Sequence, residues 1–181
     1  MKKEIINNII TIGNVDSFAF RLGKIFKNDF RDVEIFVNGE NLSTEDKQVN
    51  LPVFVTNLMH TLKLVETHNY SLYQNYFDRM SVGEMVKFIE STRNVDSVNF
   101  DIEDDFIYPH HIFLDWGETT DNISSFIVPY NNKIYITYEF WRESEDKIDS
   151  NIRNISSIEI SLEEIISTLR KTILCLQSTG N

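Results

Sequence analysis

The residues with the clearest capacity to act on another molecule are acids, and they gather in one stretch of the chain. Between positions 94 and 132 the sequence holds eight acidic residues and no lysine or arginine. Seven of these acids form two groups: Asp101, Glu103, Asp104 and Asp105, followed by Asp115, Glu118 and Asp121. A surface of one charge sign attracts a partner of the opposite sign and speeds their association. The alternative is a solvated face that serves only solubility.

A tryptophan accompanies the second acidic group. Trp116 follows Asp115 directly and ends a predicted extended run, as Trp141 does further along the chain. Aromatic side chains beside polar residues are typical of interface hot spots, so Trp116 is a candidate anchor for a partner. The alternative is a tryptophan at the edge of the core, with its N–H directed to water or to the backbone.

The first acidic group also has the alternating oxygen ligands that begin a calcium-binding loop. Such a loop needs a glycine at its sixth position and a glutamate at its twelfth, where this chain has Phe106 and Ile112. His110 and His111 are adjacent on a predicted strand, so they would point to opposite faces and could not share one ion. We therefore predict neither a bound metal nor another cofactor.

Nothing in the sequence indicates catalysis. The single cysteine, Cys175, falls in the apolar stripe of a predicted helix, where a small core residue is expected rather than a nucleophile. The carboxylate pair of Asp115 and Glu118 has no glycine-rich phosphate loop or positioned base beside it. The sequence predicts that the protein is not an enzyme.

The overall charge limits the classes of partner. The chain has 17 Lys and Arg residues against 28 Asp and Glu residues, which gives a net charge of -11. This balance argues against binding to nucleic acid or to an anionic membrane. The start of the chain, Met1-Lys2-Lys3, is followed by Glu4 and Asn7, which interrupt any apolar signal segment. We expect a cytoplasmic protein.

The elements that must position these residues begin with strands and a helix. A length of 181 residues suits one domain spanning residues 1–181. Residues 15–26 and 33–37 are predicted strands, and Asn38-Gly39 after the second is a strong tight-turn signal. Residues 43–50 form a polar loop, and Pro52 then suits the first turn of a helix.

The rest of the chain continues with helices around a set of extended runs. The spacing of Ser81 and Glu84 predicts a capping box at the start of a second helix, and Ser161 with Glu164 predicts another. Tyr70, Tyr73, Tyr76 and Phe77 recur at helical intervals. The predicted extended runs are residues 110–116, 123–128 and 133–141, the last two forming a hairpin. The fold class predicted is α+β: an antiparallel sheet with hairpins, packed against about three to four helices.

Three stretches resemble bacterial polymorphic-toxin immunity proteins, the cytoplasmic antidotes encoded beside contact-dependent growth inhibition toxins. They are Ser17-Phe18-Ala19-Phe20, Phe36-Val37-Asn38-Gly39-Glu40-Asn41-Leu42 and Asp115-Trp116-Gly117-Glu118-Thr119-Thr120-Asp121-Asn122. The resemblance implies no catalytic residues. It implies tight, specific inhibition of the C-terminal domain of a cognate toxin, commonly a nuclease.

The acids and the resemblance together predict an immunity protein that blocks a toxin domain through an acidic surface. A nuclease must display cations to hold phosphates, and acids can occupy that site as phosphate mimics. The predicted toxin-binding residues are Asp101, Glu103, Asp104, Asp105, Asp115, Trp116, Glu118 and Asp121. The main alternative is an adaptor or structural domain whose acidity is only solubilising.

Overall fold

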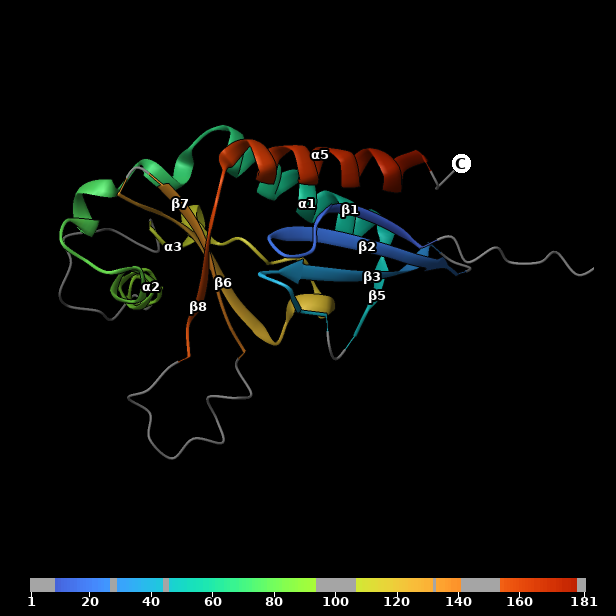
Figure 1. Ribbon diagram of the computed structural model, residues 1–181, viewed down its shortest axis with the longest axis horizontal. Coiled ribbons are helices and arrows are strands. Elements are labelled where there is room, and N and C mark those ends of the chain that lie inside the picture. The colour runs from blue at the N-terminus through green and yellow to red at the C-terminus, as the bar shows by residue number, and fades with distance from the viewer. Residues whose placement is uncertain are drawn as a thin grey trace, which may run out of the picture.

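Two antiparallel sheets organise the chain in the computed structural model, which describes residues 9–26, 29–43, 46–93, 107–131, 133–140 and 154–178 (Figure 1). The first sheet runs β1 (Ile10–Asn14), β2 (Phe18–Ile25), β3 (Phe30–Val37), β4 (Glu40–Asn41), with β5 (Gln48–Asn50) also paired to β3. The second runs β6 (Ile123–Tyr130), β7 (Lys133–Phe140), β8 (Ser156–Ile160). The helices are α1 (Leu51–Glu66), α2 (Val82–Ser91), α3 (Tyr108–His111) and α5 (Leu162–Ser178), with short 3-10 turns η1 (Asn69–Ser71), η2 (Gln74–Phe77) and η3 (Glu118–Thr120). The predicted α+β class is confirmed.

Helices cover the sheets in two places. Figure 1 shows α1 and α5 side by side over the first sheet, while α2 lies beside the second sheet. One large core joins the inner faces of both sheets to α1 and α5, through buried residues such as Phe20, Ile127 and Leu169. A second, smaller core lies between α2 and β6, around Ile89 and Phe126.

In the second sheet, β6 and the second half of β7 are the well-buried part, because they lie between these two cores, whereas β8 keeps exposed residues at Ser157 and Glu159. In β7, Ile134, Ile136, Tyr138 and Phe140 share one face, and all belong to or pack against the large core. The alternate residue Tyr135 packs against the small core instead. This division is the period-two alternation of a strand. The predicted hairpin is confirmed, because β6 and β7 are consecutive and pair antiparallel.

Local turn and cap signals form as the sequence predicts. Asn38 and Gly39 have φ of 54° and 77° and connect β3 to β4. Pro52 lies in the first turn of α1, where a missing N–H costs nothing. Ser81 and Glu84 form the complete capping box at the start of α2. In α5, the Ser161 hydroxyl accepts the Glu164 N–H at 3.1 Å, as expected at a helix start.

Several predicted boundaries are wrong. The strand predicted for residues 15–26 begins only at Phe18, because residues 15–17 form a turn closed by the Ser17 N–H on the Asn14 carbonyl at 3.0 Å. The predicted loop at residues 43–50 contains β5, and β1 and β8 were not predicted. The aromatic run from Tyr70 to Phe77 forms two 3-10 turns rather than one helix.

The largest correction concerns residues 110–116. The sequence predicts a strand, but α3 extends to His111, and only Ile112 makes an isolated bridge to Phe126. Pro109 favours the helical turn because its ring fixes φ and its missing N–H has no partner there. The chain then crosses from α3 to β6 through an extended segment and a turn.

Candidate functional site

The second acidic group lies on a turn between α3 and β6, residues 115–121, which we call the acidic turn. Gly117 has φ of 89° and ψ of −161°, a conformation that is almost confined to glycine. The Thr120 N–H and hydroxyl both donate to the Gly117 carbonyl, at 2.8 and 3.1 Å. The same hydroxyl oxygen accepts the Trp116 N–H at 3.0 Å. These bonds fix the backbone of the turn.

Trp116 fastens the acidic turn to the large core. Its indole N–H donates to the Thr61 hydroxyl of α1 at 2.9 Å. Its ring lies among four phenylalanine rings at centroid distances between 5.4 and 6.4 Å: Phe18, Phe20, Phe54 and Phe113. The side chain is only 2% exposed. Of the two alternatives for Trp116, this burial fits a core tryptophan, although its N–H meets a side-chain hydroxyl rather than water or the backbone.

The acids of the turn point to solvent. Asp115, Glu118 and Asp121 are exposed, whereas Thr119 and Thr120 between them are buried. Within the described residues, none of these three carboxylates forms an ion pair. The turn thus presents three unneutralised acids on a backbone that core contacts hold in place.

Two hollows flank the acidic turn. The Glu118 hollow has a volume of about 260 Å³ and is bordered by β3, β5, α1 and η3. The Asp115 hollow, about 270 Å³, is lined by both Asp115 and Asp121 and lies toward α3 and β6. The acids are therefore divided between two sides of the turn.

The two hollows differ in charge. The Asp115 hollow also contains Arg93, whose guanidinium lies 5.3 Å from the centroid of the Tyr108 ring. Among the described residues that line the Glu118 hollow, none is a lysine, an arginine or a second acid. Asp115 and Asp121 therefore share their hollow with a cation, Arg93, whereas Glu118 has no cation among the described residues that line its hollow.

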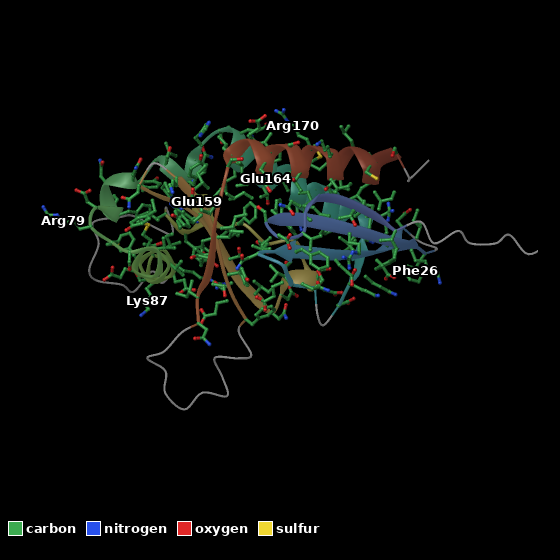
Figure 2. All side chains as sticks on the ribbon, in the orientation of Figure 1. Phe26, Arg79, Lys87, Glu159, Glu164 and Arg170 are labelled. Atoms are coloured by element: carbon green, nitrogen blue, oxygen red, sulfur yellow. The ribbon has the colours of Figure 1, made fainter. Side chains whose placement is uncertain are left out.

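Two surface cations are paired with acids outside the acidic turn. Lys133 contacts Glu159 at 2.7 Å and Arg170 contacts Glu66 at 2.6 Å. Figure 2 shows Arg170 on the outward side of α5, away from the sheets. Exposed ion pairs of this kind add little stability. Each of these two cations nevertheless already has an acidic partner that does not belong to the acidic turn.

The first acidic group, Asp101, Glu103, Asp104 and Asp105, lies outside the described residues, so its position relative to the turn stays a prediction. In the described part of the chain, no group of three or more His, Cys, Asp or Glu side chains could hold a metal ion. Cys175 is half-buried on α5 and packs against the large core. No helix of the described ranges has the length and apolarity needed to cross a membrane.

Sequence reasoning found the acids of the turn but missed what positions them. Thr61 lies 55 residues before Trp116, and nothing in its neighbourhood marks it as a partner for an indole. For Thr120, the sequence indicates only that the residue lies in a turn. A buried hydroxyl that satisfies a distant N–H leaves no periodic signal in a sequence.

Comparison with known proteins identifies the fold. No family model matches the sequence, and no curated protein matches it. Among solved structures, the chain is similar to CdiI from Burkholderia dolosa AUO158, an immunity protein of a contact-dependent growth inhibition system. The TM-score is 0.59 at 16% identity, over 92% of this chain and 99% of that one. The chain therefore has the fold of a CdiI immunity protein over most of its length.

Proposed function

We propose that this chain is a cytoplasmic immunity protein that binds and neutralises a cognate toxin domain, a basic nuclease, by occupying it rather than by catalysis. The observation that carries the proposal is the fold likeness to a CdiI protein over 92% of the chain. The sequence resemblance noted above points to the same family. The single domain over residues 1–181 is part of the same proposal.

The acidic turn supplies the chemistry that such an inhibitor needs. A nuclease holds phosphates with lysine and arginine, so its active surface is cationic. Asp115, Glu118 and Asp121 can meet those cations as phosphate mimics. Because core contacts already fix the turn, little conformational freedom is lost on binding, which favours affinity.

The first acidic group extends the proposed binding surface. Asp101, Glu103, Asp104 and Asp105 add four charges close in sequence to the turn. We place the centre of the interface at the acidic turn and assign the first group to the steering of the toxin. Charges at the rim of an interface alter mainly the association rate.

The test is a binding measurement with a basic toxin domain, sought among the genes that neighbour the gene of this chain. The wild-type protein should bind that domain tightly and should ignore DNA and RNA at about 150 mM salt, where weak contacts are screened. Changing Asp115→Asn, Glu118→Gln and Asp121→Asn together should speed dissociation at least about thirtyfold, because charges at the centre of an interface are desolvated. It should also slow association about tenfold and flatten its dependence on salt.

A matched control removes the same number of charges from other surfaces. Asp16→Asn, Asp78→Asn and Glu163→Gln change exposed acids on three separate segments. If only general acidity attracts the toxin, both triple variants should lose association rate equally. Equal losses would refute the acidic turn as the binding site and favour the solubilising role.

A further inference from the structure

The floor of the Glu118 hollow is apolar. It consists of Val49, Phe54 and Trp116, whose exposed fractions are 4%, 1% and 2%. These side chains belong to the large core and show only their outermost atoms to the hollow. An apolar floor of this kind favours methylene groups over water.

The rim of the hollow carries two large apolar side chains that face solvent. Val53 of α1 is 55% exposed and Phe30 of β3 is 37% exposed. A single exposed apolar residue is ordinary, but two that border one hollow above an apolar floor mark a place where a partner side chain gains by contact.

The walls of the hollow are built on fixed elements. The first residue of β3, Phe30, pairs with Asn50 of β5. The Asn50 side chain then accepts the Val53 N–H at 3.4 Å and so caps α1. The opposite wall is the acidic turn, which Trp116 holds to the core. The hollow is therefore preformed, which lowers the entropy cost of filling it.

We propose that the Glu118 hollow receives one long cationic side chain of the toxin domain, a lysine or an arginine. Its methylene groups lie against Val53 and the apolar floor, and its charged head meets the carboxylate of Glu118. Lysine and arginine characteristically bury their stems and keep their heads at a polar edge. This assignment rests on the proposed function and names the contact at its centre.

Size and charge select this occupant over others. A volume of about 260 Å³ lies below the range of roughly 300–1,000 Å³ that is usual for small-molecule sites, and it suits a single side chain. Glu118 is the only ionisable residue among the described residues that line the hollow, so a cation is the complementary charge. A second copy of this chain, with its net charge of -11, would be repelled.

The first test is a kinetic separation between two acids of the same turn. A charge that is buried by a partner affects dissociation, whereas an exposed one affects association. Glu118→Gln should therefore speed dissociation of the toxin domain about thirtyfold. Asp121→Asn should slow association about threefold and leave dissociation nearly unchanged, because Asp121 lies on the other side of the turn.

The second test asks whether one toxin side chain contacts both Glu118 and Val53. Val53→Ala alone should weaken binding severalfold, and combined with Glu118→Gln it should cost less than the product of the two single effects. Val53→Ala combined with Asp121→Asn should give the simple product. Replacing the lysines and arginines of the toxin by alanine, one at a time, should reveal one position that abolishes the effect of Glu118→Gln.

The outcomes separate this inference from the function on which it rests. If wild type binds the toxin but Glu118→Gln and Val53→Ala leave dissociation unchanged, the hollow is refuted and the proposed function stands. If the wild-type protein does not bind the toxin at all, both are refuted. The melting temperature of each variant should match wild type, because Glu118 and Val53 are exposed.

Discussion

His111 is a histidine that the fold holds neutral, and its titration gives a direct test of the structure around the acidic turn. The side chain is 0% exposed and its ring meets Phe77 edge to face at 5.2 Å. Nδ1 lies 2.8 Å from the Ile127 carbonyl of β6, so Nδ1 carries the proton and donates it. Nε2 has no acceptor within the described residues. Protonation would bury a charge and an unpaired N–H, and burial accordingly lowers the pKa of His111 to about 4.

The lowered pKa makes stability depend on pH in a defined direction. In the unfolded chain the pKa of the imidazole is about 6.5, so the unfolded state binds the proton first as pH falls. The contribution of His111 to the free energy of unfolding is therefore lost as pH falls from about 6.5 to about 4, and it is constant above that window. The full difference in pKa corresponds to about 3 kcal/mol, and about 1.4 kcal/mol of it is lost by pH 5.5.

The assay is urea unfolding followed by tryptophan fluorescence at about pH 7.5 and pH 5.5, both above the isoelectric point of 4.8. His111→Asn keeps an amide N–H for the Ile127 carbonyl but cannot titrate. Between the two pH values, wild type should lose about 1.4 kcal/mol more than the variant. The other three histidines and all carboxylates are present in both proteins, so their contributions to the pH dependence of stability cancel in the difference. Parallel losses would refute a buried neutral His111.

The remaining predictions concern the acidic turn. Gly117→Ala should lower the free energy of unfolding by about 1–3 kcal/mol because alanine resists the backbone conformation there. The matched change Gly83→Ala in α2, where a Cβ meets nothing within 4 Å, should raise that free energy by up to about 1 kcal/mol; equal effects would contradict the turn geometry. In a double-mutant cycle, Trp116→Phe and Thr61→Val should couple by about 1 kcal/mol in urea unfolding. Additive losses would mean that the indole bond contributes nothing.

Elements that depend on contacts between residues close in sequence could be predicted from the sequence. The Asn38-Gly39 turn, the proline at the start of α1 and the capping box of Ser81 with Glu84 each depend on contacts within four residues, and all three formed. The apolar stripe of α5 is likewise a local period: Ile165, Leu169, Ile173 and Leu176 are buried.

Elements that depend on contacts between residues far apart in the sequence could not be predicted in this way. Residues 110–116 resemble a strand in composition, but the bond from His111 to Ile127 and the bond from Trp116 to Thr61 hold that segment in another shape. The choice between a core tryptophan and a binding anchor at Trp116 could not be made from the sequence for the same reason, because five aromatic rings gather there from separate parts of the chain. The acids could be identified from the sequence because the charge of a side chain follows from its residue type alone.

Neutralisation of the toxin is the central claim, and a titration of toxin activity tests it most directly. The proposed cognate toxin domain is held at a fixed concentration well above its dissociation constant, and the protein is added in steps while cleavage of nucleic acid is measured. We expect activity to fall linearly and to vanish near one equivalent, with no change when an unrelated nuclease is used. Full toxin activity in the presence of excess protein would contradict the account.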